Sequence, residues 1–535
     1  MATGYQSRRN SGLFNPDILQ SQVSFTDQVI GVYPTGYLDA ETSVDDYYIE
    51  GLIPVLQGKR FAERLELGAR YSDYEHTEEE TTWKSLINWQ VNDMLRFRGG
   101  FNRATRAPNL GELFLNPQEI FTGGGLFGDP CGVRSNSPFG AGGTSDDPVL
   151  SPGETNPPPL AAGQTPDGAM STRMICEAMM GGPGSSAVTQ FYELNNAPAA
   201  GGGGFAWVLQ RGNPNLRSEV ADTWTWGFVL NLRNNMTWAV DWYKVDIEDA
   251  IMLYSLTYAS YQCFGTRIVT TPQEAAEQAQ TEACRLVPRD LNNGAALTAM
   301  LQYDNHATIK TSGVDIAWNW LKPVGAANLN FNLQATVLDE YKTKASPAPF
   351  DPEIEWKGSL GPSGLTGTNP GAYEYRLFGS VGYSRNNWNV SLRWRHLPSV
   401  WSATYAQQQA IRENNAAVAA GGPGIMLSWT PTTEIESDDY NVFDLSFRWD
   451  LSDTMSLRGG VTNLFDTEPK VVGRSAGYPV GTDLTSVCDS LGYTADNRQG
   501  CQNPFAYSLP GAGTMNPGYY DTLGRRFFVG LNLRF

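Results

Sequence analysis

The sequence has no apolar run of 18 residues or more, so the kind of segment that crosses a membrane as a single helix is missing. Charged residues make up only 18% of the 535 residues, and the formal net charge is −18, which argues against a nucleic-acid-binding protein. The chain has no C-x2-C pair and only three histidines, which are scattered along it, so neither a zinc site nor a catalytic triad is indicated. We expect no enzyme, no metal and no cofactor.

Cysteine is scarce, but its placement is regular. The six cysteines form three neighbouring pairs, each inside one loop-like segment: Cys131 with Cys176, Cys263 with Cys284, and Cys488 with Cys501. Local pairing in loops is typical of disulfides made in an oxidising compartment, although six unrelated free thiols are the alternative.

A short helix is expected between the second pair of cysteines. In the segment TPQEAAEQAQTEACRL, Thr271 is placed to cap the helix and Pro272 to occupy its first position. The helix would bring Cys284 close to Cys263.

The most frequent pattern in the chain is an alternation of apolar and polar residues, which predicts β-strands with one apolar face. It recurs at 64–71, 95–102, 223–232, 314–320, 329–337, 388–395, 443–449 and 527–535. If the apolar faces meet lipid, the opposite faces line a wet interior. There we expect the arginines that fall on the polar parity, which include Arg96, Arg98, Arg393, Arg395 and Arg448.

A water-soluble β-sandwich also alternates, but three features favour a membrane barrel. The segments are about 9–14 residues long, as membrane-crossing strands are, and tryptophans recur near their ends. Short links at 57–61, 91–93, 233–235, 321–328, 385–387 and 451–453 alternate with long ones at 105–217, 248–305, 340–370, 400–437 and 466–522. This places every long loop at one end of an antiparallel sheet, as in bacterial outer-membrane barrels.

Several segments resemble a known family. FRGGFNRATRAPNLGELF, from Phe97 to Phe114, is similar to the strand-and-loop motif of TonB-dependent receptors, the active transporters of the Gram-negative outer membrane. NPNLRSEVADTWTWGF, LGARYSDY, GGVTNLFDTEP and the terminal GRRFFVGLNLRF resemble other recurring stretches of that family. Together they extend over most of the chain from about residue 45 to residue 535.

The resemblance assigns a set of motif positions. Pro108 ends ladder pairing where the strand leaves the membrane, because proline has no N–H. Asn463 and Asp466 follow a strand and are expected to turn the chain by bonding its backbone. Phe535 resembles the terminal residue that the outer-membrane assembly machinery reads. The motif positions are Arg103, Arg106, Pro108, Asn109, Glu112, Phe114, Asn463, Leu464, Phe465 and Asp466.

The resemblance implies an all-β fold, an antiparallel transmembrane β-barrel with long extracellular loops. About 13–14 strands can be counted, against 22 in the family's barrel. We therefore expect residues 1–44 to be a partly irregular N-terminal segment with a possible strand, and 45–535 to be the C-terminal part of the barrel. A signal peptide and a plug domain are not recognisable, so we expect a truncated gene product or an incomplete reading frame.

The implied function is capture of a scarce solute by the outer loops, followed by TonB-energised uptake across the outer membrane of a Gram-negative bacterium. The expected partners are membrane lipid, TonB through the missing plug region, the assembly machinery and a small-molecule substrate, with no nucleic acid. A passive porin-like channel is the alternative.

The substrate and its binding residues stay open. Siderophores, vitamin B12 and oligosaccharides all fit, although an acidic mouth favours a neutral or cationic solute. Its acids are Asp146, Asp147, Glu434, Glu436, Asp438 and Asp439. Spacing does not choose among the loop aromatics Phe121, Phe127, Tyr192, Tyr258, Tyr261 and Trp401.

Overall fold

The structure is a computed structural model of the chain. It describes residues 1–19, 36–57, 62–122, 129–132, 168–193, 206–232, 235–362, 371–422, 426–427, 432–469, 473–479 and 520–534. Within these ranges no helix has the length and apolar character needed to span a membrane.

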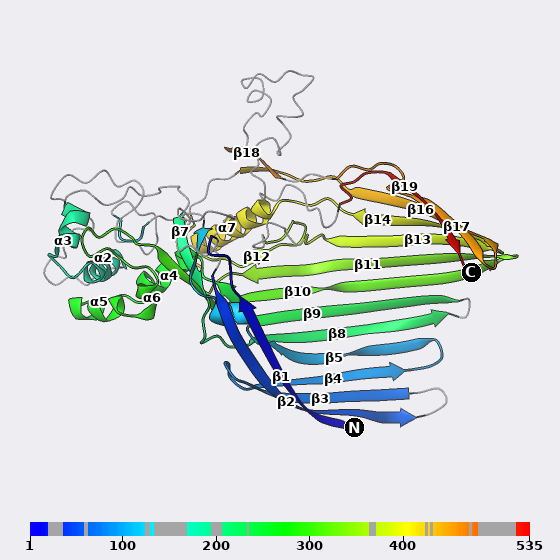
Figure 1. The fold of residues 1–535 in the computed structure, drawn as a ribbon, viewed down its shortest axis with the longest axis horizontal. Helices are drawn as coiled ribbons and strands as arrows, with labels where there is room; N and C mark the ends of the chain where they lie inside the picture. Colours follow the sequence, from blue (N-terminus) through cyan, green and yellow to red (C-terminus); the bar gives the residue numbers. More distant parts are fainter. Residues whose placement is uncertain are drawn as a thin grey trace, which may run out of the picture.

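One antiparallel sheet dominates the molecule (Figure 1). Each strand pairs with the next one in a continuous series, in the order β1, β2, β3, β4, β5, β8, β9, β10, β11, β13, β14, β16, β17, β19. Their bounds are Ala2–Phe14, Leu38–Gln57, Ala62–Tyr74, Glu80–Gln90, Leu95–Arg106, Glu219–Leu232, Met236–Leu253, Ala299–Val324, Ala327–Lys344, Tyr375–Arg385, Trp388–Leu397, Tyr440–Ser452, Met455–Thr462 and Arg526–Leu533.

The remaining elements lie in the long connections. Five short strands are β6 (Gln118–Thr122), β7 (Ala206–Arg211), β12 (Ile354–Glu355), β15 (Thr432–Ile435) and β18 (Gly473–Pro479). The helices are α1 (Leu110–Phe114), α2 (Gly168–Met179), α3 (Ser186–Val188), the π-helix η2 (Thr189–Glu193), α4 (Leu256–Phe264), α5 (Pro272–Ala279), α6 (Glu282–Arg285) and α7 (Ala403–Ala419).

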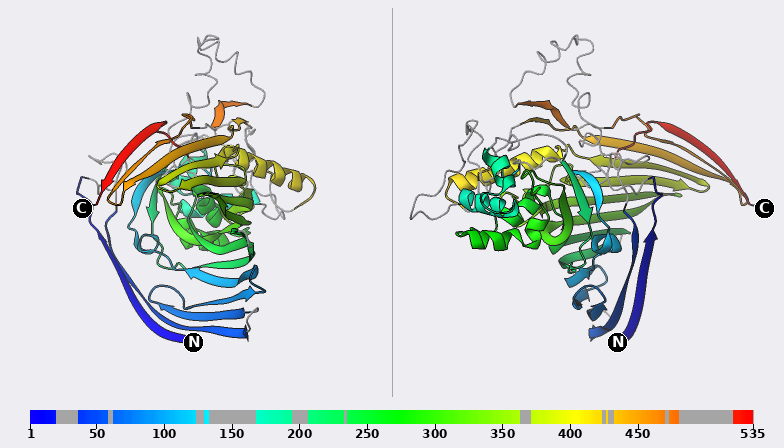
Figure 2. Two further views of the ribbon diagram at one scale, coloured as in Figure 1. Left: turned by 90° about the vertical axis from the view of Figure 1, so that its right-hand side faces the viewer. Right: turned by 60° about the vertical axis from the view of Figure 1, so that its left-hand side comes forward.

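The sheet bends into an open arc rather than a closed cylinder (Figure 2). Among the described residues, no register pairing joins β19 to β1, so both outer strands have a free edge. The sequence prediction of an antiparallel barrel fold in partial form is confirmed. Lipid offers no partner for the backbone groups of a free edge, so further strands are needed to complete a membrane-spanning wall.

The convex face of the sheet is apolar and exposed. On β8, for example, Trp226 is 50% exposed and Trp224 43%, and the same parity on neighbouring strands presents Phe97 and Leu67. Exposed apolar side chains at every second position would be costly in water, since each Å² of apolar surface removed from water is worth about 25 cal/mol. The pattern fits a face that contacts lipid.

Aromatic side chains on this face gather in two bands. Near the long connections, the rings of Trp83 and Trp224 each lie 4.7 Å from the ring of Phe101. Near the short turns, Trp388 stacks on Trp449 at 4.7 Å, and Trp238 lies 5.7 Å from Trp318. Such bands are typical of the two interfaces of an outer-membrane barrel.

The concave face carries ion pairs that reach across an intervening glycine. Arg98 on β5 bonds Asp241 on β9 with N–O distances of 2.7 and 2.5 Å, and Gly227 of β8 lies between them in the register. In the same way, Lys84 on β4 passes Gly68 on its way to Glu50 of β2. The arginines predicted for a wet interior therefore lie on this face, where Arg98 is paired.

Gly227→Ala is expected to lower the stability of the sheet by about 1–3 kcal/mol, because it overpacks a crowded site. A Cβ atom at this position would lie 2.2 Å from Asp241 Oδ1, so the Arg98–Asp241 pair would have to move. Denaturant unfolding in detergent measures the change. Gly51→Ala on β2 is the matched control, because nothing lies within 4 Å of its Cβ position. Equal stabilities of the two variants would contradict the prediction.

The long connections all leave from one end of the sheet, as the sequence predicted. They are the β5–β8, β9–β10, β11–β13, β14–β16 and β17–β19 connections, and the tight turns lie at the opposite end (Figure 1). Helices α2 to α6 with η2 gather there as a helical cap. Parallel pairing of β7 with Ala299–Gln302 of β10 joins this cap to the wall of the sheet.

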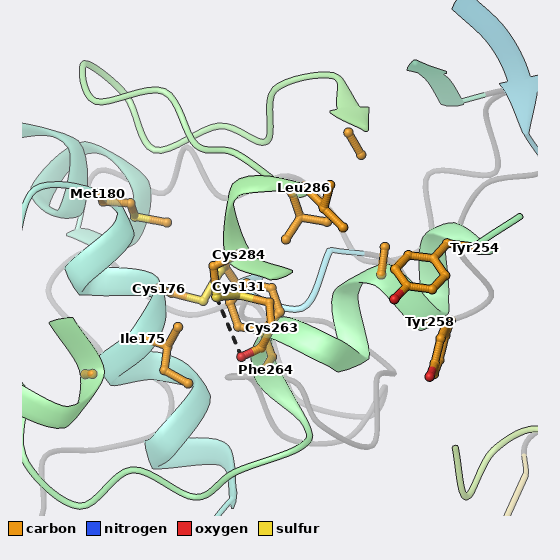
Figure 3. Packing of buried hydrophobic residues seen from close by; sticks show 14 of the residues in the cluster. Cys131, Ile175, Cys176, Met180, Tyr254, Tyr258, Cys263, Phe264, Cys284 and Leu286 are labelled. Atoms are coloured by element: carbon orange, nitrogen blue, oxygen red, sulfur yellow. Dashed lines mark hydrogen bonds between the residues drawn. A yellow bond between two sulfur atoms is a disulfide. The ribbon is translucent and has the colours of Figure 1, made fainter. Parts of the chain in front are cut away.

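The helical cap has a core of its own, built from the β5–β8 and β9–β10 connections. Ile175, Met180, Phe191 and Val269 are fully buried in it. Two disulfides lie in the same core, Cys131–Cys176 and Cys263–Cys284 (Figure 3). Both pairings were predicted from the sequence; Cys488 and Cys501 lie outside the described residues.

The predicted helix is confirmed at its start and is shorter than its segment. Thr271 Oγ1 accepts a hydrogen bond from Glu274 N at 3.2 Å, and Pro272 occupies the first turn of α5. The helix ends at Ala279, and α6 carries Cys284.

The N-terminal region contains more strand than the sequence indicated. β1 occupies Ala2–Phe14, and β2 begins at Leu38, before the expected boundary at residue 45. β1 has few apolar residues, so alternation did not reveal it; it is ordered by pairing with β2 along its whole length.

Candidate functional site

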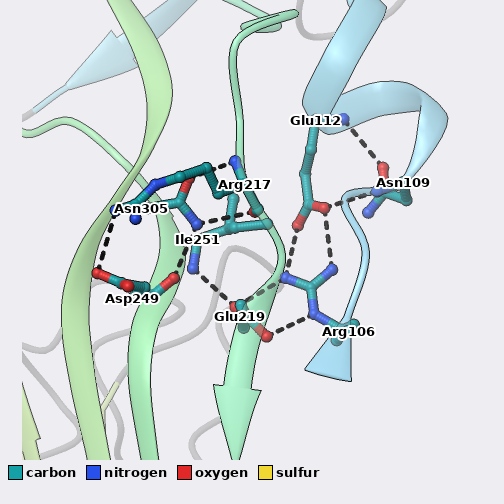
Figure 4. Close-up of polar contacts among 8 residues, drawn as sticks. All are labelled: Arg106, Asn109, Glu112, Arg217, Glu219, Asp249, Ile251 and Asn305. Atoms are coloured by element: carbon teal, nitrogen blue, oxygen red, sulfur yellow. Dashed lines mark hydrogen bonds and ion pairs between the residues drawn. The ribbon is translucent and has the colours of Figure 1, made fainter. Parts of the chain in front are cut away.

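The family motif at the end of β5 forms a polar clamp at the rim of the sheet (Figure 4). The Arg106 guanidinium donates to Glu219 on β8 at 2.6 and 2.8 Å, and to Glu112 on α1 at 2.9 and 3.2 Å. Glu219 Oε1 also accepts from Ile251 N on β9 at 2.7 Å.

Helix α1 is held in the same clamp by a capping box. Asn109 Oδ1 accepts from Glu112 N at 2.9 Å, and the Glu112 carboxylate accepts from Asn109 N at 2.8 Å. Each helix start leaves free N–H groups, and this reciprocal arrangement satisfies two of them. The clamp therefore fixes the direction in which the first long connection leaves the sheet.

A second set of contacts fixes the chain where it returns. Asn305 on β10 accepts from Arg217 N at 2.8 Å and donates to the carbonyls of Arg217 and Asp249, both at 2.9 Å. Arg217 also forms an ion pair with Asp249 at 3.5 Å. The β5–β8 and β9–β10 connections are thus tied to one another at their base (Figure 4).

The other motif residues near β5 lie around the clamp. Pro108 is buried just beyond the last ladder residue, and Phe114 packs edge-on against the His76 ring at 4.9 Å. Arg103 faces outward and bonds Asp222 on β8 at 2.7 Å through two nitrogens.

The NLFD motif forms the predicted turn after β17. Asn463 and Asp466 both adopt left-handed backbone conformations, with φ of 51° and 56°. Asn463 bonds the backbone of Thr467 in both directions, and Asp466 accepts from Arg525 N at 2.7 Å. Leu464 N donates to the Phe443 carbonyl, and Phe465 is exposed beside the Phe443 ring. Phe535 lies outside the described residues.

Beneath the clamp, the concave face of β1–β5 contains a cleft of about 940 Å³, which we call the wall cleft. Residues 108–111 form its upper border. Two lining residues, Ser72 and Arg8, bond the fully buried Asp46, which accepts from Ser72 Oγ at 2.6 Å and from Arg8 Nη2 at 3.0 Å. Its other polar lining residues include Tyr48, Arg70, Tyr74, Lys84 and Asn102.

Sequence reasoning did not find this cleft. Arg8 and Asp46 lie on different strands, one of them in the segment expected to be irregular, and nothing in the sequence shows that β1 pairs beside β2. The available signal was alternation within β2 and β3, which places Asp46, Arg70 and Ser72 on the polar parity.

The loop aromatics fall into different environments. Tyr192 and Tyr258 are buried in the helical cap, and Tyr261 packs against its core. Trp401 is half-buried and stacks on Tyr405 at 4.1 Å. The side chains of Phe121 and Phe127 lie outside the described part of the chain.

The structure describes the side chains of only three of the six acids predicted for the mouth. Glu436 accepts from Ser399 Oγ at 2.7 Å and Asp439 from Ser399 N at 3.1 Å, so both stabilise a connection. Asp438 also has a partner. Asp146, Asp147 and the Glu434 side chain lie outside the described residues.

In the ranges that the structure describes, no group of three or more His, Cys, Asp or Glu side chains is placed to hold a metal ion.

His306 makes the attachment of the helical cap sensitive to pH. Its ring stacks on Tyr258 at 4.8 Å and meets Tyr254 edge-on at 5.2 Å, and Nδ1 lies 2.9 Å from the Asp304 carbonyl. Burial lowers the pKa of His306 below its ordinary value of 6.5, against the weaker opposing effect of Asp304. The unfolded segment then binds a proton more readily than the folded one, so stability falls as the pH drops below 6.5.

Hydrogen exchange in α4 is therefore expected to be faster at pH 5.5 than at pH 7.5, after correction for the intrinsic rates. His306→Gln should remove this difference. Burial raises the pKa of Asp351, so the contribution of Asp351 makes stability fall as the pH rises, opposite to that of His306. Because Asp351 is present in both proteins, the difference in pH dependence between parent and variant reports on His306. The same pH dependence in both proteins would contradict the assignment.

Comparisons with known proteins agree with this arrangement. The family described as TonB dependent receptor-like, beta-barrel matches residues 3–161 and 180–464. Comparison with curated proteins finds no match.

Two solved structures of one receptor show the same fold at low sequence identity. A mutant of the ferric enterobactin receptor PfeA from Pseudomonas aeruginosa is similar with a TM-score of 0.51 and 11% identity, over 100% of this chain and 50% of that one. A second PfeA mutant, in complex with enterobactin, has a TM-score of 0.51 and 12% identity, over 99% and 51%. The siderophore receptor PirA from Acinetobacter baumannii has a TM-score of 0.47 and 12% identity, over 100% and 55%.

The chain thus spans about half the length of these solved structures. The family match includes the rim clamp, the wall cleft and most of the sheet with its outward apolar face. The protein belongs to the family of TonB dependent receptor-like β-barrels.

Proposed function

We propose that the chain forms part of an outer-membrane receptor, which captures a small solute at its loop-bearing end and releases it inward in a TonB-energised step. The observation that carries this proposal is the two-faced sheet, with exposed tryptophans on its convex side and ion pairs on its concave side. Such a sheet suits a wall between lipid and a wet lumen.

In this proposal the parts of the chain have different roles. Residues 45–535 supply the C-terminal part of the barrel, and residues 1–44 the strand that extends it at the N-terminal edge. TonB acts through a plug region contributed by the rest of the receptor, and Phe535 directs membrane assembly. The chain itself carries transport rather than catalysis, in a Gram-negative outer membrane.

Capture at the loop-bearing end is favoured by rigidity there. Recognition residues commonly lie on loops that a rigid scaffold holds in place. Here two disulfides cross-link the helical cap internally, and the β7–β10 pairing joins it to the wall. A prearranged surface loses less conformational entropy when a ligand binds.

Uptake by cells provides the test. The chain is expressed together with the plug region of the receptor in a Gram-negative host with and without TonB, and accumulation of labelled ferric siderophores, vitamin B12 and oligosaccharides is measured. The proposal expects at least one class to accumulate only when TonB is present.

A passive channel gives the opposite result. Uptake that persists without TonB, together with ion conductance in planar bilayers, would support that alternative. Protein that stays monodisperse without detergent and inserts into no bilayer would contradict both functions.

A further inference from the structure

The carboxylates in and around the wall cleft are already engaged. Asp46 is fully buried between Ser72 and Arg8, and Lys84 Nζ holds Glu50 at 3.2 Å and Glu66 at 2.7 Å. At the upper border, Arg106 holds both Glu112 and Glu219. Of these acids, only Glu50 and Glu66 keep part of the carboxylate exposed, and both are paired with Lys84.

The hydrogen-bond donors of the cleft are much less engaged. Arg70 makes a single long ion pair, 4.0 Å to Asp46, and its side chain is 43% exposed. Its guanidinium lies 5.7 Å from the centre of the Tyr48 ring, which orients it without using its N–H groups. Arg8 donates to Asp46 through Nη2 alone, and its side chain is 46% exposed.

Neutral donors lie beside these arginines. Asn102 is opposite Lys84 in the register and lines the same cleft, as Tyr74 does. Among the described residues, neither side chain has a hydrogen-bond partner. The open groups of the wall cleft thus include the guanidinium groups of Arg70 and Arg8, the carboxamide of Asn102 and the phenol of Tyr74; Asn10, Thr82 and Thr105 also line it.

We propose that the wall cleft binds a small oxyanion rich in acceptor oxygens, with Arg70 and Arg8 holding its charged oxygens. An arginine fork matches two oxygens of a carboxylate or similar group, and such charge-assisted bonds are stronger than neutral ones. Asn102 and Tyr74 donate to uncharged oxygens. This inference rests on the proposed function and narrows its substrate class.

The volume and position of the cleft agree with this class. About 940 Å³ is within the range of pockets that enclose small ligands. The cleft lies on the concave face of β1–β5 beneath the rim clamp, and its two free arginines offer only hydrogen-bond donors to a solute. A neutral or cationic solute, which the acidic mouth favours, would leave Arg70 and Arg8 without a partner.

Calorimetric titration of the full chain in detergent tests the inference, with citrate as the oxyanion, maltotriose as the neutral solute and spermidine as the cation. Citrate is expected to bind, and Arg70→Gln to weaken its binding roughly 10-fold or more. Arg70→Lys should recover part of the loss, because it restores the charge without the fork. Arg393→Gln, on the concave face of β14, is the matched control and should bind citrate like the parent.

Folding of Arg70→Gln is checked by its thermal unfolding, since Asp46 keeps Ser72 and Arg8 as partners. Lack of citrate binding at millimolar concentration, or equal binding by parent and Arg70→Gln, would overturn the inference. Preferred binding of maltotriose or spermidine would also overturn it. Such a result, combined with TonB-dependent uptake, leaves the proposed function intact. Citrate binding through Arg70 without TonB-dependent uptake instead refutes the function and retains the site.

Discussion

Replacing Cys131 and Cys176 together by alanine is expected to destabilise the helical cap by about 4 kcal/mol. The estimate follows from the sequence separation of 45 between the two cysteines, because the entropy that a cross-link removes from the unfolded loop grows with the logarithm of the loop length. Cys131 lies in the short described segment 129–132, and the buried Arg289–Asp129 pair is its other tie to the cap. Without the disulfide, this segment keeps that ion pair as its remaining tie to the cap among the described residues.

Limited proteolysis of the membrane-embedded protein measures the effect, with α2 as the expected site of new cleavage. Alanine is used because it introduces no polar atom into a core where both cysteines are fully buried. The control is Cys263→Ala with Cys284→Ala, which opens a loop of 21 residues and should cost about 3 kcal/mol. If α2 stays as resistant as in the parent, the cap does not depend on this cross-link.

The third predicted pair, Cys488 with Cys501, is tested by peptide mapping without reduction. Three loop-confined bridges are expected. Free thiols at all six positions in exported protein would show that the sequence argument for an oxidising compartment is mistaken.

Most strands of the sheet were predictable because each carries its own alternating pattern; β1, which has few apolar residues, is the exception. Alternation over 223–232 or 329–337 needs no information from elsewhere in the chain, and the short turns fix which neighbours pair. Even the local disulfides follow, since each cysteine lies near its partner in sequence. The end of the sheet that bears the loops could therefore be deduced without coordinates.

The functional contacts were not predictable, because they join strands across long connections. Arg98 and Asp241 are 143 residues apart, and Arg106 and Glu219 are 113 apart. Which residues face one another depends on the register of β5 with β8, and the intervening connection does not set that register. Gly227 shows the same limit: a glycine within a strand suggests close approach, but the sequence does not say that an arginine passes over it.

Arg106→Gln is expected to loosen the rim clamp by about 2–3 kcal/mol. It leaves two carboxylates facing each other without a cation, and their side chains are only 13% and 14% exposed. Breaking a fully buried ion pair costs roughly 3–5 kcal/mol; the smaller value here reflects the 45% exposure of the Arg106 side chain. Denaturant unfolding in detergent measures the loss, and trypsin cleavage near α1 locates it.

Two further variants show whether the loss of stability comes from breaking the clamp or simply from removing an arginine. Arg103→Gln removes an equally charged neighbour whose partner Asp222 is 33% exposed, so it should cost only about 0–1 kcal/mol. Adding Glu219→Gln to Arg106→Gln removes the repulsion and keeps an acceptor for Ile251 N, so about 1 kcal/mol should return. A double variant less stable than Arg106→Gln would mean that Glu219 acts through β9 alone. The motif arginine would then stabilise α1 rather than join the two long connections at their base.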